Sequence, residues 1–444
     1  MKSRLLMCIT AMTVAAIAAP AWLFAQEQQE KERIRYTVTD LGLASFFTGG
    51  INDKAWVDYS AILPDGTEHA TLFRRGRKID LGTLGGPNSS PVHRTSEKGQ
   101  VVGQAETSTK DPLGEDFCGY GTNLICLGFV WQNGLMLPLP ILGGHNAAAT
   151  DINDRGEIVG NAETDTPDPT CPPPQVLQSL PVIWKNGEIH ELPTLSGDPD
   201  GSASAINDRG QIVGASANCT TPFHAVLWQN DTVTDLGSLG GSMGNFATNI
   251  NNRGQVIGLS DLPGDQTNDA FLWTEGNGMK DLGTLPGDVG SGAFGINENG
   301  QVVGLGSRAI FWQNGTLTDL NTLIPGPPFS PLYLLFAYDI NSNGEIVGVG
   351  LANTGEFHAF VATPCDQDHT GTKGCNDVDI STGAEQPAPV GGSAGPSTPT
   401  PSNLAIRGRI NTTLDRFRSR QFRGRYFLKP WGSGQVSLPA TQVQ

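Results

Sequence analysis

The sequence INDRGQIVG at residues 206–214 decides the fold, because the same pattern returns along most of the chain. The successive copies end 44, 57, 54, 44, 46 and 44 residues apart. A fixed period of this kind predicts a repeat architecture, here with a basic unit of 44 residues and insertions in the second and third units. The other copies are INDKAWVDY (51–59), TSEKGQVVG (95–103), INDRGEIVG (152–160), INNRGQVIG (250–258), INENGQVVG (296–304) and INSNGEIVG (340–348), the first two being degenerate.

Each unit also has a second half, as in VIWKNGEIHEL (182–192) and IFWQNGTLTDLNTL (310–323). It reads as a strand, an Asn-Gly turn of type I′ and another strand. The IN-x-x-G half predicts two further strands, joined by a turn that Asn opens and in which Gly takes the left-handed position. Four antiparallel strands per unit, A to D, make one blade of a β-propeller.

The two ends of the repeat region complement each other. The last unit has its third strand, HAFVATP (358–364), with no strand D after it, whereas YTVTDLG (36–42) matches the strand D of VTDLGSL (233–239). We therefore expect an all-β, seven-bladed β-propeller of four-stranded blades over residues 26–364, closed by the N-terminal strand, which hides the sheet edges. A linear stack of hairpins would not explain why the two partial ends sum to one blade.

The segments outside the repeats predict an exported protein with a tail. Residues 1–25 have Lys2 and Arg4 before an apolar run and small residues at the end, which is typical of a secretory signal peptide. No later segment reaches the roughly 20 apolar residues needed to cross a bilayer. We expect a secreted or extracytoplasmic monomer, in the periplasm or at the cell surface, with a Cys-stapled turn and a Gly/Pro/Ser linker at 365–404 and a basic, mostly disordered tail at 405–444.

The charge of the chain is unevenly distributed. Its net value is −16, and after the tail's +7 (residues 403–444) and the leader's +2 are taken away, residues 26–402 carry −25. An acidic body of this kind repels phosphates, so we expect no nucleic acid partner.

At this point the residues resemble the HAF-repeat family of predicted extracellular β-propeller-like proteins. The resemblance rests on His358, Ala359 and Phe360, on HAVLW from His224, on DAFLW from Asp269 and on DLGTLGG at 80–86, and it covers roughly residues 36–364. It implies location and architecture and does not supply a reaction. The recurring His69, His224 and His358 and the recurring tryptophans are expected to cap or pack strands, because other units lack them.

Six cysteines remain after export, an even number that is compatible with disulfides. We expect Cys118 to pair with Cys126, Cys171 with Cys219, and Cys365 with Cys375. No pair has CxxC spacing and no turn gathers several carboxylates, so we expect no metal and no cofactor.

With alternating strands, the B-to-C and D-to-A connections lie on one face and contain all the insertions, and function on such scaffolds usually sits in the longer loops. The longest are 104–127 and 161–180. That these loops are merely tolerated insertions is the alternative. The candidate binding residues there are Asp111, Glu115, Asp116, Tyr120, Asp165 and Asp168.

These features favour an extracellular binding or scaffolding module, with a polysaccharide or a protein as its partner, over an enzyme. A carbohydrate-active hydrolase or lyase is the alternative, since Arg94, Asp151 and Asp339 are expected near the channel, where carboxylates could converge. Solvated channel lining explains the same residues. A passive envelope component is the third hypothesis, and no nucleophile elbow, phosphate loop or HExxH motif is present.

Overall fold

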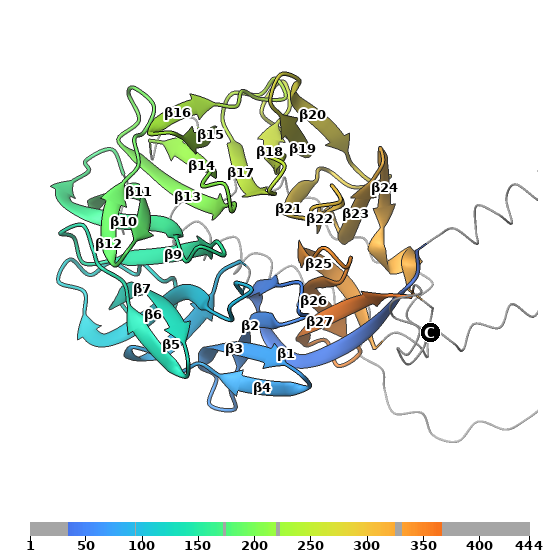
Figure 1. The fold of residues 1–444 in the computed structure, drawn as a ribbon, viewed down its shortest axis with the longest axis horizontal. Coiled ribbons are helices and arrows are strands. Elements are labelled where there is room, and N and C mark those ends of the chain that lie inside the picture. The colour runs from blue at the N-terminus through green and yellow to red at the C-terminus, as the bar shows by residue number, and fades with distance from the viewer. Residues whose placement is uncertain (1–33, 94, 172–174, 219–222, 325–330, 366–444) are drawn as a thin grey trace, which may run out of the picture.

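The computed structural model describes residues 34–93, 95–171, 175–218, 223–324 and 331–365. Except for one short 3-10 helix, η1 (Leu320–Leu323), the elements of these residues are β-strands. They form six antiparallel sheets, five of four strands and one of seven. Figure 1 shows the sheets arranged around a central axis, with β13, β17, β21 and β25 near the axis and β16, β20 and β24 on the rim. The predicted leader (1–25) and tail (405–444) lie outside the described residues, as does most of the predicted linker.

Each four-stranded sheet is a meander in which consecutive strands are neighbours. The first three contain β5 (Gly85–Pro91), β6 (Val101–Lys110), β7 (Leu124–Gln132) and β8 (Leu135–Pro138); β9 (Ala147–Ile152), β10 (Ile158–Pro167), β11 (Leu177–Lys185) and β12 (Glu188–Glu191); and β13 (Asp200–Ile206), β14 (Ile212–Ala217), β15 (His224–Gln229) and β16 (Thr232–Asp235). The other two contain β17 (Asn245–Ile250), β18 (Val256–Asp261), β19 (Asn268–Thr274) and β20 (Gly278–Gly283); and β21 (Gly292–Ile296), β22 (Val302–Leu305), β23 (Ala309–Gln313) and β24 (Thr316–Asp319).

The seven-stranded sheet joins the two ends of the repeat region through one long strand. Its order is β25 (Leu332–Ile340), β26 (Ile346–Ala352), β27 (Phe357–Pro364), β1 (Tyr36–Ile51), β2 (Val57–Ile62), β3 (Glu68–Arg74) and β4 (Arg77–Asp80). The first half of β1 pairs with β27, from Tyr36 opposite Pro364 to Leu43 opposite His358. Its second half pairs with β2. The expected pairing of residues 36–42 with 358–364 is therefore present.

The predicted turns have the expected backbone. Asn186 and Gly187, between β11 and β12, both have positive φ, at 54° and 83°, as a type I′ turn requires. Gly210, in the turn between β13 and β14, has a φ of 80° and so occupies the left-handed position.

The last glycine of the repeat lies opposite a β-bulge. In β17 the register with β18 shifts between Ala247 and Asn249, and Gly258 is the partner of Ala247. A Cβ on Gly258 would overlap the carbonyl oxygen of Phe246 and lie 2.8 Å from the ring of Phe271. The repeat therefore keeps glycine here because the bulge brings backbone into the space of a side chain.

The core is divided into apolar layers between neighbouring sheets. Trp184 of β11 packs with Val102 and Val130 of the preceding sheet, and its Nε1 donates to Pro140 O at 2.8 Å. The recurring tryptophan thus packs between sheets, as expected from the sequence. In the part of the chain that the structure describes, no helix is long and apolar enough to cross a membrane.

Candidate binding face and central channel

The asparagine of each IN-x-x-G turn joins one sheet to the next. Asn207 is completely buried. Its Oδ1 accepts the N–H groups of Arg209 and Gln211, both at 3.0 Å. Its Nδ2 donates to Gln211 Oε1 at 2.8 Å and, across the sheet boundary, to Asn251 O at 3.0 Å. One side chain therefore closes its own turn and links it to its neighbour.

The same link recurs around the axis. In the described residues it runs from the last repeat to the first as well, because Asn341 Nδ2 donates to Asn52 O at 3.0 Å. The second repeat has Ser96 in the place of asparagine, and there Ser96 Oγ accepts the N–H of Gln100. The remaining links join Asn52 to Ser96, Asn153 to Asn207, Asn251 to Asn297 and Asn297 to Asn341, at 2.9 to 3.2 Å.

In five of these turns the residue directly after the asparagine, or after Ser96, is an acid. These five carboxylates line one end of the central axis. Each accepts the backbone N–H of an adjacent turn at 2.7 to 2.9 Å. They border a cavity of about 90 Å³, whereas ligand pockets usually span about 300–1,000 Å³. This end therefore suits water or an ion rather than a sugar. The carboxylates are Asp53, Glu97, Asp154, Asp208 and Glu298.

The channel residues expected from the sequence also link sheets. Asp151 Oδ2 accepts the N–H of Ile206 at 2.9 Å, and Asp339 Oδ2 accepts the N–H of Ile51 at 3.1 Å. Both carboxylates are almost fully buried. Arg94 lies outside the described residues.

Sequence reasoning missed a third buried carboxylate, Asp58 of β2. It is fully buried, and it accepts Thr95 Oγ1 at 2.6 Å and Gly50 N at 3.0 Å. Burial raises the pKa of Asp58 well above its ordinary value, and the charges of Asp339 and Asp151 add to this, against the two hydrogen bonds. The available signal was the sequence VDY at 57–59, which has a carboxylate where most units have an apolar residue.

The candidate acids of the first long loop mostly accept hydrogen bonds that hold the loop in its conformation. Asp111 Oδ1 accepts the N–H groups of Leu113 and Glu115, at 2.8 and 3.0 Å. Its Oδ2 accepts Asn146 Nδ2 at 2.9 Å. Glu115 Oε1 accepts Val176 N at 2.6 Å, which joins this loop to the second long loop. The predicted proximity of the two loops is therefore present, and both carboxylates are buried.

The tip of the first loop is held by further internal contacts. Cys118 and Cys126 form a disulfide, as the sequence predicts. Both oxygens of Asp116 lie 2.9 Å from the N–H of Gly121. Tyr120, in the same part of the loop, is partly buried. The loop therefore has a defined conformation of its own.

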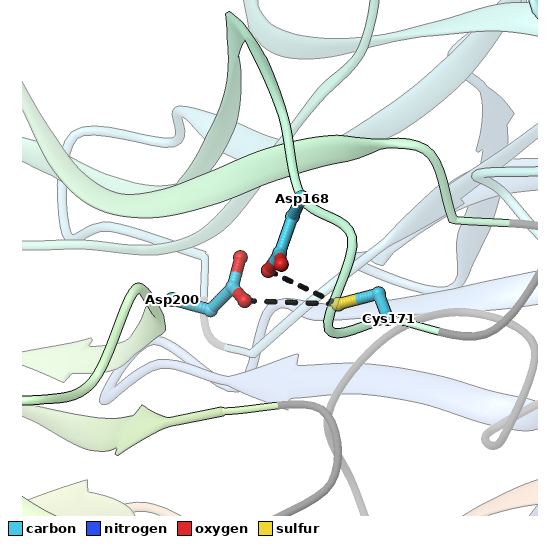
Figure 2. Close-up of side chains that lie close together, drawn as sticks. All are labelled: Asp168, Cys171 and Asp200. Carbon is cyan, nitrogen blue, oxygen red and sulfur yellow. Dashed lines mark hydrogen bonds between the residues drawn. The ribbon is translucent and has the colours of Figure 1, made fainter.

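Two buried carboxylates, Asp168 of the second loop and Asp200 at the start of β13, face the sulfur of Cys171 (Figure 2). Cys171 Sγ lies 3.3 Å from Asp168 Oδ2 and 3.7 Å from Asp200 Oδ2. These three could hold a metal ion by position. However, Cys171 is disulfide-bonded, and a disulfide sulfur provides no thiolate ligand. Its predicted partner Cys219 lies outside the described residues, as does Cys375, the predicted partner of the disulfide-bonded Cys365.

The described residues of the two long loops include exposed side chains at the tip of each loop. Asp165 is exposed at the end of β10, in contrast to Asp168, which accepts Thr170 N at 2.8 Å and is buried. Leu113 exposes 44% of its surface at the tip of the first loop. Lys110 of the first loop and Thr166 of the second are exposed as well, so a ligand could reach both loops through more than one side chain.

The histidine of the HAF triplet pairs with the aspartate of the next strand. His69 Nδ1 lies 2.9 Å from Asp80, and His358 Nδ1 lies 2.8 Å from Asp40. His224 instead contacts Asp198, at 3.0 Å. The histidines therefore join strands to one another, a more specific role than the capping or packing expected from the sequence.

Comparisons with known proteins identify no relative by sequence: no family model and no curated protein matches the chain. The solved structures that it resembles include a puromycin-hydrolysing peptidase of Mycobacterium tuberculosis, with a TM-score of 0.43, 13% identity and coverage of 72% of this chain and 50% of that one. The β-propeller domain of the Trilobed protease from Pyrococcus furiosus has a TM-score of 0.42 and 12% identity, with 61% and 79% covered. TolB from Acinetobacter baumannii has 0.35 and 10%, with 74% and 97% covered. The chain thus spans half the length of the first of these structures.

Proposed function

We propose that this protein is an exported seven-bladed β-propeller that acts as an extracellular binding or scaffolding module. Its ligand is a polysaccharide or a protein, held on the face with the long B-to-C and D-to-A loops. The hydrogen bond from Val176 N to Glu115 Oε1 carries this proposal, because it joins the two longest loops into one lobe. A lobe that is already ordered loses less conformational freedom on binding than two flexible loops.

The seven-stranded sheet corresponds to two four-stranded blades if β1 is counted in both, and with the five other sheets this gives seven blades. The first half of β1 is then the outer strand of the last blade and its second half the inner strand of the first. The pairing of Tyr36 with Pro364 at one end of β1, and of Ile51 with Val57 at the other, supports this count. The link from Asn341 to Asn52 supports a ring in the same way, since it joins the last turn to the first.

The hydrogen bonds of the carboxylates expected near the channel favour binding over catalysis, because these groups already hold the protein's own backbone. Asp151 and Asp339 each accept a backbone N–H that joins two sheets. A hydrolase or lyase remains the second candidate because Asp58 is a buried acid with a raised pKa near two other carboxylates, an arrangement known for general acids.

Export is proposed from the N-terminal sequence and from the disulfide. Residues 1–25 have the pattern of a cleaved leader. The bond between Cys118 and Cys126 is of the kind that persists in oxidising compartments. A passive envelope role is the third candidate, and it differs from the first in predicting no saturable ligand.

The test is a glycan array and a polysaccharide pull-down with the full mature chain, its Leu113→Ser and Asp165→Asn variants, and Leu135→Ser as the control. Leu113 and Asp165 are exposed on the two loops, whereas Leu135 is 64% exposed on β8, away from them. We expect saturable binding that both loop variants weaken at least fivefold and the control leaves unchanged.

Any other outcome would support a different site or a different function. Binding that the control weakens as much as the loop variants would refute the loop face as the site. Release of reducing ends from a bound polysaccharide, abolished in Asp58→Asn, would establish the hydrolase or lyase instead. No binding to any glycan or to extracellular protein fractions would leave the passive role.

A further inference from the structure

The face with the long loops, called the loop face below, carries many exposed acids. Several of them end the outer strands: Asp40, Asp80, Glu191, Asp235 and Asp281. Others lie in or beside the B-to-C connections: Asp65, Asp165 and Glu356. In the described residues, the exposed Lys and Arg side chains on this face are Lys110 and Lys78, whose Nζ donates to Leu41 O. The loop face is therefore strongly negative.

The opposite face, which carries the A-to-B and C-to-D turns and is called the turn face, has the reverse sign. Five of its A-to-B turns each present an exposed base: Lys54, Lys98, Arg155, Arg209 and Arg253. The C-to-D turns add Arg75, Arg77 and Lys185. Its exposed acids are fewer, namely Asp53, Glu188, Asp231 and Glu275. A positively charged partner is therefore attracted to the loop face rather than to the turn face.

The loop face also carries most of the exposed apolar side chains. Of the seven large apolar residues that are exposed in the described part of the chain, five lie in the D-to-A connections or in the first long loop. The other two lie on β8. Exposed apolar side chains on a face with charge of one sign indicate a polypeptide partner that is apolar and of the opposite charge. The five are Leu43, Leu113, Ile141, Met243 and Val289.

The chain contains a segment of this composition outside the described residues. Residues 403–444 hold eight Lys or Arg against Asp415 alone, which gives a net charge of +7. Aromatic residues lie between these bases or directly after them: Phe417, Phe422, Tyr426, Phe427 and Trp431. Guanidinium groups pair with carboxylates in a fixed geometry, and aromatic rings cover apolar surface. The tail therefore matches the loop face in both charge and apolar content.

The tail is long enough to reach the loop face from the point where the described chain ends. The last strand, β27, ends at Pro364, and Cys365 N donates to Arg35 O at 2.7 Å. A strand of eight residues such as β27 is about 26 Å long. A Gly/Ser-rich connection of the length of residues 366–402 spans about 30–36 Å on average, which exceeds this distance.

We propose that the basic tail, residues 403–444, docks on the acidic loop face of its own chain. The inference rests on the loop face being a binding surface, as proposed above, and it names the segment that occupies this face when no other ligand is bound. The arginines pair with the exposed acids at the ends of the outer strands, and the aromatic rings cover the exposed apolar side chains. Any other ligand of the loop face then has to displace the tail.

The test is fluorescence anisotropy of a labelled synthetic peptide of residues 403–431, titrated with the full mature chain and with a full-length variant whose own tail has lost five charges. A tethered tail competes at an effective concentration of about 1 mM, so we expect the peptide to bind the variant about tenfold more tightly than the wild type, or better. Binding should weaken as NaCl rises from about 0.02 M to about 0.5 M, because exposed charges are screened. The variant combines Arg416→Gln, Arg418→Gln, Arg420→Gln, Arg423→Gln and Arg425→Gln.

Two matched sets of substitutions in this five-glutamine variant locate the docking face. Glu191→Gln, Asp235→Asn and Asp281→Asn remove three exposed acids from the loop face, and asparagine keeps the side-chain oxygen that accepts the N–H of Gly237 or Gly283. The control set, Glu188→Gln, Asp231→Asn and Glu275→Gln, removes three exposed acids from the turn face. We expect the loop-face set to weaken peptide binding about fivefold or more, and the control set to change it by less than about twofold.

Three results would overturn the proposal: no peptide binding by either protein, equal affinity of the wild type and the five-glutamine variant, or a control set that weakens binding as much as the loop-face set. The wild type should also sediment as a monomer, because a dimer that the five glutamines dissociate would assign the tail to a second copy. Failure of the proposed function is distinguishable, since an array without any ligand for the loop face would leave the peptide results unchanged.

Discussion

Replacing Asn207 with alanine tests whether the linked turns hold the sheets together. The substitution removes four hydrogen bonds. The N–H of Arg209 lies in a partly exposed turn and can bind water, and Asn251 O still accepts the N–H of Gly254, whereas the buried Gln211 N loses its acceptor. A buried polar group left without a partner costs about 1–3 kcal/mol, so the unpaired Gln211 N should lower the free energy of unfolding by about 1–3 kcal/mol.

The assay is equilibrium unfolding in urea, followed by tryptophan fluorescence. Asn207→Ser is the control, because Ser96 shows that a hydroxyl in this position still accepts the N–H four residues on. We expect serine to lose roughly half as much free energy as alanine, since it keeps one buried acceptor. A loss below about 1 kcal/mol for alanine, or equal losses for the two variants, would refute the idea that the side chain stabilises the sheet boundary.

Three further predictions concern single features of the fold. Gly258→Ala should lower the free energy of unfolding by about 1–3 kcal/mol or more, because the added methyl overlaps Phe246 O at the bulge; urea unfolding that matches the wild type would contradict this. Since burial raises the folded-state pKa of Asp58, only the unfolded chain ionises as the pH rises above about 4, so stability falls as the pH rises through that raised value. Asp58→Asn should flatten this fall, measured by urea unfolding at pH 5 and pH 8, and an unchanged slope would count against it. Replacing Cys118 and Cys126 by serine should cost about 2–3 kcal/mol through loop entropy, and unchanged resistance of the loop to proteolysis would argue that the disulfide is dispensable.

The repeat made the strands and turns predictable from the sequence. Asn207 and Gly210 recur at fixed spacing, so their places in the turn follow from local backbone preferences, and the φ of Gly210 agrees. The contact between Trp184 and its neighbouring sheet was predictable for the same reason, because a large apolar ring that recurs in most units is expected to pack against the next unit.

The candidate site was less predictable, because the direction of a carboxylate depends on contacts distant in sequence. Asp111 and Glu115 resemble solvent-facing loop acids, yet they accept N–H groups of their own loops and of Val176, 61 residues beyond Glu115. The partner of His358 is Asp40, 318 residues away, which no local pattern indicates. Asp58 was missed because its unit is the most divergent copy of the repeat.

The double use of β1 has a consequence for the order in which the chain can fold. Ribosomes produce residues 36–43 before the rest of the repeat region and their partners at 358–364 at its end, so the first half of β1 has no place to pair until nearly the whole repeat region has been made. The intermediate blades can form as their own hairpins emerge, since their contacts are local. The nascent chain therefore has to keep one apolar strand, with Tyr36 and Leu41 exposed, from pairing elsewhere for the entire time of synthesis.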